Sequence, residues 1–85
     1  MAKLIPAAKR VEMARALIRE ARELPVPEEG GRFNFNYVIS VKAKLREARE
    51  LVKLIPRTVG IAEETRADAR RVTEEADQAH QDIFH

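Results

Sequence analysis

A seven-residue apolar repeat runs from Tyr37 to Ile83 without an insertion or deletion, although Pro56 lies inside it. A repeat of about 3.5 residues keeps one stripe of a helix facing a partner helix, so the pattern predicts a coiled-coil seam. The first seam position of the successive heptads holds Val38, Leu45, Val52, Val59, Arg66, Thr73 and His80, and the second holds Val41, Ala48, Ile55, Ala62, Ala69, Ala76 and Ile83. The seam is well filled as far as Ala62 and thin beyond it.

The composition limits the chain to a single small domain, residues 1–85. The chain has 85 residues, of which 35% are charged and 5% aromatic, with no Trp, so its core must be built from Leu, Ile, Val and Ala. The absence of cysteine excludes disulfides and thiolate metal sites. No stretch approaches the roughly 20 apolar residues of a membrane span. The N-terminus lacks the apolar segment of a secretory signal, so we expect a cytoplasmic location.

Two proline signals divide the chain into helices. A first amphipathic helix is predicted over residues 7–24, because Ala7, Val11, Ala14, Ile18 and Ala21 recur at helical spacing, and prolines 25 and 27 end it. A second helix is predicted over residues 37–55, with Asn36 as its N-cap. An Ala/Glu/Arg-rich helix is predicted over residues 57–83. Pro56 either kinks one continuous helix or occupies the first turn of a new one.

The connection over residues 25–36 contains two aromatic rings at alternating positions. Phe33 and Phe35 alternate with asparagines, and Gly30-Gly31 is suited to a turn. The segment is therefore either a short β arm, with residues 24–26 against 32–35, or an irregular loop anchored by the two rings. In both cases we expect at least one ring to pack at a boundary between subunits.

The first two helices carry the same apolar face. The hexapeptide Arg-Glu-Ala-Arg-Glu-Leu occurs at residues 19–24 and again at residues 46–51. The predicted fold is therefore all-α: an antiparallel helical hairpin followed by a C-terminal coiled-coil helix that has no partner inside the chain. Such a monomer would be only marginally stable, which favours a homodimer or tetramer. The predicted oligomer interface consists of Val38, Val41, Leu45, Ala48, Val52, Ile55, Phe33 and Phe35.

The chain offers no constellation of catalytic residues. Its only serine is Ser40, and both histidines lie near the C-terminus. Asp77 and His80 are three residues apart on one helix, a spacing found in metal-binding bundles, but the other helices supply no further ligands. The sequence therefore predicts a protein that is not an enzyme and that uses no cofactor, metal or small-molecule substrate.

Charge is distributed unevenly along the chain. Residues 1–57 carry 13 basic and 7 acidic side chains, a balance of +6, whereas residues 58–85 carry 3 and 7, a balance of −4. The basic part could bind nucleic acid or an anionic membrane surface, through Lys42, Arg46, Arg49 and Lys53. Alternatively, the basic hairpin of one copy could dock on the acidic helix of another.

The order of segments along the chain resembles that of small bacterial coiled-coil proteins of the DivIVA-like type. The resemblance covers residues 24–79 and is carried by Leu24-Pro25, residues 33–36, Ile55-Pro56 and the Ala/Glu/Arg-rich tail. It implies a scaffold for cell division or envelope growth that acts through self-association. This chain differs from that family in lacking an obvious membrane-inserting loop with a basic and aromatic tip, unless Arg32-Phe33 forms that tip.

The first function predicted from the sequence is that of a non-enzymatic, self-associating coiled-coil scaffold or adaptor, with itself or another protein as partner. The alternative is a module that binds nucleic acid or an anionic surface.

Overall fold

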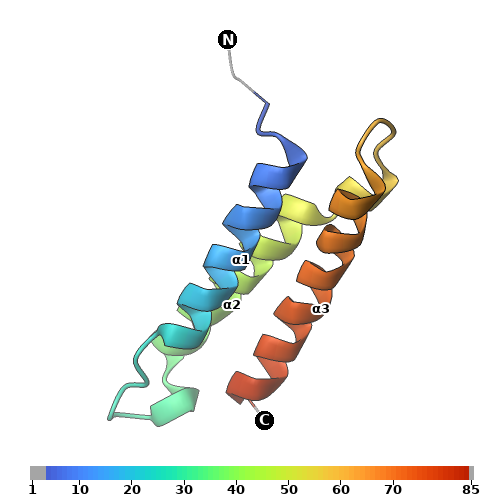
Figure 1. Cartoon of the computed structure of the whole chain (residues 1–85). Helices are drawn as coiled ribbons and strands as arrows, with labels where there is room; N and C mark the ends of the chain where they lie inside the picture. Colours follow the sequence, from blue (N-terminus) through green and yellow to red (C-terminus); the bar gives the residue numbers. More distant parts are fainter. Residues whose placement is uncertain (1–3, 85) are drawn as a thin grey trace.

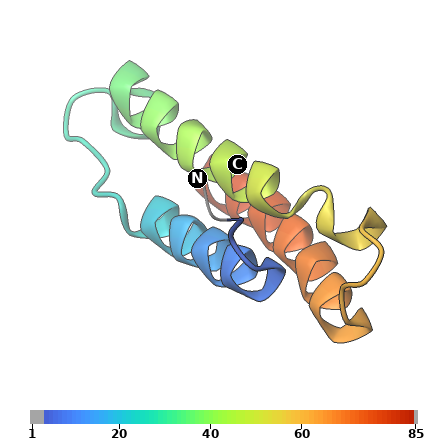
Figure 2. The same cartoon turned by 90° about the horizontal axis from the view of Figure 1, so that it is seen from above.

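The computed structural model describes residues 4–84, and its regular structure is entirely helical. It contains three α-helices, α1 (Ala7–Glu23), α2 (Phe35–Val52) and α3 (Glu63–Phe84). The short 3-10 helices η1 (Gly31–Phe33) and η2 (Ile55–Arg57) lie in the two connections. Figure 1 shows α1 descending, α2 ascending and α3 descending, and Figure 2 shows the two connections at opposite ends of an elongated bundle.

The predicted third helix has its partners inside the chain, which corrects the expectation of an unpartnered coiled-coil extension. Helix α3 turns back and packs against both α1 and α2. Its buried face is made of Ala69, Val72, Ala76 and Ala79. Because these side chains are small, α3 can approach the other two helices closely and close the bundle without a second chain.

One contiguous core runs between the three helices. Leu45, at 0% exposed, is the largest side chain that is fully buried. Among residues 4–84, no charged or polar residue is buried in the core. Its members are Val11, Ala14, Ile18 and Ala21 of α1, Tyr37, Val41, Leu45, Ala48 and Val52 of α2, Ile55 of η2, and the four residues of α3.

The first connection forms a turn and a 3-10 helix, and no strand occurs within residues 4–84. Gly30 and Gly31 adopt φ angles of 81° and 53°, which reverse the chain before η1. A Cβ atom on Gly30 would lie 3.2 Å from the Cα atom of Asn34, so the turn leaves little room for a side chain. Of the residues proposed for a β arm, 24–26 are irregular, 32 and 33 lie in η1, and Phe35 begins α2, so the two segments do not pair as strands.

Helix α2 begins two residues earlier than predicted, because Asn34 and not Asn36 is its N-cap. The Asn34 Oδ1 atom accepts a hydrogen bond from the backbone N–H of Tyr37 over 3.1 Å. The Asn34 Nδ2 atom donates to the carbonyl of Glu29 over 2.9 Å. One side chain thus caps the helix and closes the preceding turn.

Pro56 neither kinks a continuous helix nor starts α3. Helix α2 ends at Val52, four residues before Pro56, where the proline ring would collide with the helical carbonyl. Pro56 instead lies in η2, and Gly60 at φ 91° turns the chain toward α3, which starts at Glu63 rather than near residue 57. The second and third predicted helices are accordingly shorter at this junction.

Candidate interaction surfaces at the two ends of the bundle

Most of the predicted oligomer interface lies inside the single chain. Five of its members, Val41, Leu45, Ala48, Val52 and Ile55, are at most 2% exposed and belong to the bundle core. Val38 is half-buried. In this structure the seam of α2 is therefore occupied by α1 and α3 and is not open to a second copy.

Phe33 and Phe35, unlike the predicted interface residues in the core, lie on the surface of the protein. Phe33 is 87% exposed and Phe35 is 75% exposed. Neither ring belongs to the core of the protein. Of the eight residues predicted at an oligomer interface, these two have large apolar side chains that remain available to another molecule.

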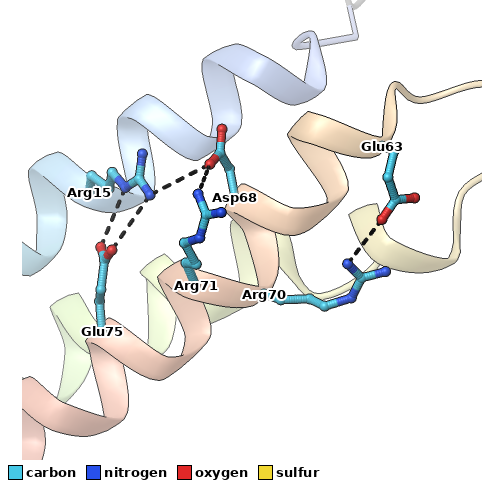
Figure 3. Close-up of polar contacts among 6 residues, drawn as sticks. All are labelled: Arg15, Glu63, Asp68, Arg70, Arg71 and Glu75. Carbon is cyan, nitrogen blue, oxygen red and sulfur yellow. Dashed lines mark hydrogen bonds and ion pairs between the residues drawn. The ribbon is translucent and has the colours of Figure 1, made fainter.

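Several basic residues of α1 and α2 form ion pairs with acidic residues of α3 in the same molecule. Arg15 of α1 lies between two acids of α3, as Figure 3 shows: its Nε atom donates to Glu75 over 3.4 Å, and its guanidinium is 4.0 Å from Asp68. Arg71 also binds Asp68, over 2.9 Å. The acidic helix is thus held against the basic hairpin of its own chain.

Two further ion pairs connect α3 to the other helices. Arg22 of α1 binds Asp82 over 3.0 Å, and Arg49 of α2 binds Asp77 over 2.9 Å. These pairs are solvent-exposed, so each contributes about 0–1 kcal/mol to stability. They orient α3, whereas the apolar core supplies most of its attachment.

Only part of the predicted anion-binding set remains unpaired. Arg49 binds Asp77, and Lys53 binds Glu50 over 2.8 Å. Lys42 and Arg46 are exposed on the outer face of α2, and within residues 4–84 neither has a carboxylate partner. The structure therefore reduces the four predicted residues to a pair of free cations one helical turn apart.

The pair Asp77 and His80 has structural contacts. Asp77 accepts a hydrogen bond from the Arg49 guanidinium, and the ring centroids of His80 and Phe84 are 5.0 Å apart. Phe84 in turn packs edge-on against Tyr37, with ring centroids 6.5 Å apart. Across the part of the chain that the structure describes, no three His, Asp or Glu side chains gather in a way that could hold a metal ion.

Large exposed apolar side chains gather at the two ends of the bundle. We call residues 4–6 and 53–62 the upper end, and residues 24–35 with Ile83 and Phe84 the lower end, following Figure 1. The upper end exposes Leu4, Ile5, Leu54 and Val59, the lower end exposes Val26, Phe33 and Phe35, and Ile39 lies one turn of α2 further along. In the described residues, the flanks between the ends expose no other large apolar side chain.

Sequence reasoning missed the upper end. Val59 was assigned to the seam, yet it is 92% exposed, and Leu54 is 57% exposed. The signal was present, because Pro56 lies between Leu54 and Val59, Gly60 follows Val59, and both breakers disfavour a continuous helix. A helical seam is therefore not expected to run through Val59.

The lower end also has a shallow apolar groove beside its exposed rings. The groove is lined by the apolar residues Leu24, Pro25 and Pro27 and by Tyr37, together with Asn34, Asn36 and Ser40. Tyr37 itself is only 7% exposed and belongs to the core. The groove has no charged lining residue, and its apolar side chains suit an aliphatic side chain of a partner.

The two ends differ in charge. Residues 53–62 at the upper end contain Lys53 and Arg57; Lys53 is paired with Glu50, so Arg57 is the unpaired charge of this segment. Residues 24–34 at the lower end contain Glu28, Glu29 and Arg32, a balance of −1. The helix directions add a smaller difference of the same sign, because α1 and α3 have their positive N-terminal ends at the upper end and only α2 runs the opposite way.

Comparison of the chain with models of known protein families, with curated proteins and with solved structures finds no match. Within residues 4–84, no helix combines the length and the apolar character needed to cross a membrane.

Proposed function

We propose that the protein is a non-enzymatic scaffold or adaptor that acts by associating with further copies of itself through the ends of its bundle. The observation that carries this proposal is the exposure of Phe33 and Phe35, at 87% and 75%. A phenylalanine side chain buries about 150–250 Å² when it is covered, so two free rings on a soluble monomer favour a protein partner. The route differs from the coiled-coil seam predicted from the sequence, because that seam is already filled.

Self-association is tested by measuring the mass of the whole chain across concentration. Light scattering or sedimentation from about 10 µM to about 1 mM should show a mass that rises above 9.7 kDa. The double variant Phe33→Ser/Phe35→Ser should stay near the monomer mass and keep its circular dichroism. Its matched control, Glu74→Ser/Gln78→Ser, changes two exposed residues in the middle of α3 and should associate like the original protein.

A second candidate function is binding to an anionic surface by the outer face of α2. Lys42 and Arg46 favour it, since they are exposed and lack a carboxylate partner among the described residues. The logarithm of the protein's affinity for duplex DNA or for anionic vesicles should fall linearly with the logarithm of the salt concentration. The change Lys42→Glu/Arg46→Glu should abolish binding, whereas Arg19→Glu, an exposed cation of α1, should leave most of it.

Absence of binding at about 50 mM salt, where such contacts are strongest, would exclude this second function and leave self-association unaffected.

A further inference from the structure

We propose that the copies associate head to tail, with the upper end of one molecule seated on the lower end of the next. This inference rests on the proposed self-association and adds which two surfaces meet. It follows from the shapes of the ends, from their charges and from the symmetry of the resulting contact.

The shapes of the two ends are complementary. The upper end projects narrow aliphatic side chains, with Val59 at 92% exposed and Leu54 at 57%. The lower end offers broad rings, Phe33 and Phe35, beside the groove over Tyr37. A projecting aliphatic side chain can enter that groove while the rings cover its neighbours, so the two surfaces exclude water from each other.

Charge distinguishes this arrangement from pairing through like ends. Arg57 at the upper end and Glu28 and Glu29 at the lower end are exposed, and none of them has an oppositely charged partner among the described residues. Contact between two upper ends would bring Arg57 close to a second Arg57, and contact between two lower ends would place four glutamates beside two Arg32 side chains, a balance of −2. Contact between opposite ends places Arg57 near Glu28 and Glu29, and it also aligns the helix dipoles.

A contact between opposite ends leaves one unused surface of each kind on every dimer. Such a heterologous contact gives a ring if the rotation between copies closes and an open chain if it does not. Because the two surfaces lie at opposite ends of an elongated molecule, we expect the open chain. Each end exposes only a few large apolar side chains, fewer than the roughly 20–30 residues that each partner contributes to a standard interface, so we expect the association to be weak and to depend on concentration. The longest dimension of the molecule is 48 Å, and each added copy should extend the chain by about this length.

Two variants that each disable one end test the proposal. The lower-end variant is Phe33→Ser/Phe35→Ser, and the upper-end variant is Leu54→Ser/Val59→Ser. Each alone should be monomeric, because every contact needs one intact end of each kind. An equimolar mixture should form a 1:1 complex of twice 9.7 kDa and grow no further, since only one intact pair of ends exists. X-ray scattering should show this complex lengthened with an unchanged cross-section.

Other outcomes overturn the head-to-tail arrangement. If the molecules pair through two lower ends, the upper-end variant alone will dimerise and mixing the variants will add no further association. If they pair through two upper ends, the lower-end variant alone will dimerise. An original protein that stays at 9.7 kDa throughout the concentration range refutes self-association itself, together with this inference. Association of the original protein that both variants retain refutes the head-to-tail contact alone.

Charge reversal provides an independent check that leaves the apolar residues intact. Arg57→Glu and Glu28→Lys/Glu29→Lys should each weaken association at low salt by about tenfold or more. Mixing these two variants should restore it, because opposite charges again meet at the contact. Absence of this rescue contradicts the assigned pairing of ends.

Discussion

Asn34 shows how one side chain can determine the start of a helix. Its oxygen caps α2 at Tyr37 and its amide nitrogen closes the turn at Glu29. We expect Asn34→Ala to lower the free energy of unfolding by about 1–2 kcal/mol, which urea denaturation followed by circular dichroism would measure. Asn36→Ala is the matched control, since Asn36 is exposed, and it should change stability by less than about 0.5 kcal/mol. Equal effects of the two changes would contradict the assigned cap.

Leu45 is the residue whose role changed most between sequence and structure. As a seam residue it was expected to contact a second copy, but it is 0% exposed inside one chain. Leu45→Ala should therefore cost about 2–5 kcal/mol of the free energy of unfolding, independently of protein concentration. Leu54→Ala, at an exposed position, should cost little stability. A loss of stability that disappears at high protein concentration would instead assign Leu45 to an intermolecular contact.

Single residues could be assigned to the apolar face more reliably than to a partner. The spacing of Val41, Leu45 and Val52 marks one stripe of a helix, and that stripe is buried. Periodicity does not say whether the covering helix belongs to the same chain. The cap was misplaced because Asn34 and Asn36 are chemically identical, and only the turn at Gly30 and Gly31 selects between them.

Helix α3 illustrates the same uncertainty at the scale of an element. Its seam is poor in large side chains, and from the sequence alone this pattern predicts a weak coiled coil. In the folded chain those alanines allow α3 to lie close to α1 and α2. The turn over residues 53–62 decides the outcome, because Pro56 ends the helical path and lets α3 return to the hairpin.

Close packing of α3 leads to a prediction about overfilling. Ala76 is 0% exposed, so Ala76→Leu should force α3 away from its neighbours and lower the free energy of unfolding by about 1–3 kcal/mol. Gln78→Leu places the same side chain on the exposed face of α3 and should be close to neutral. Urea denaturation of both variants gives the comparison. A neutral Ala76→Leu would mean that the helix has room to spare at this position.

The ion pairs of α3 lead to a second prediction at this scale. Because Arg15, Arg22 and Arg49 make exposed pairs, raising the salt concentration from about 50 mM to about 500 mM should reduce stability by no more than about 1–2 kcal/mol. Arg15→Met removes the central pairs and should make this salt dependence smaller, while Arg19→Met should preserve it. A collapse of the fold at high salt would show that charge, and not the core, attaches α3.

At the scale of the whole molecule, the three helices depend on one another. A chain truncated after Arg57 would lose the four core residues of α3 and expose the faces of α1 and α2 that α3 covers. We expect this fragment to lose most of its helical circular dichroism, because two helices of this length bury too little surface to offset the cost of ordering. Adding a peptide of residues 58–85 should restore helicity, whereas the same peptide with Ala69→Asp and Ala76→Asp should not. A stable, fully helical fragment would contradict this dependence.

An odd number of alternating helices carries the chain from one end of the bundle to the other, so Leu4 and Phe84 lie at opposite ends (Figure 1). A tensile load applied between these two residues therefore acts along the helix axes. It slides α1 and α3 lengthwise past α2, straining many core contacts at once, whereas a load across the axes would peel the helices apart one contact at a time. When pulled between these two residues, the bundle is therefore expected to resist a load along its length more strongly than a load across it.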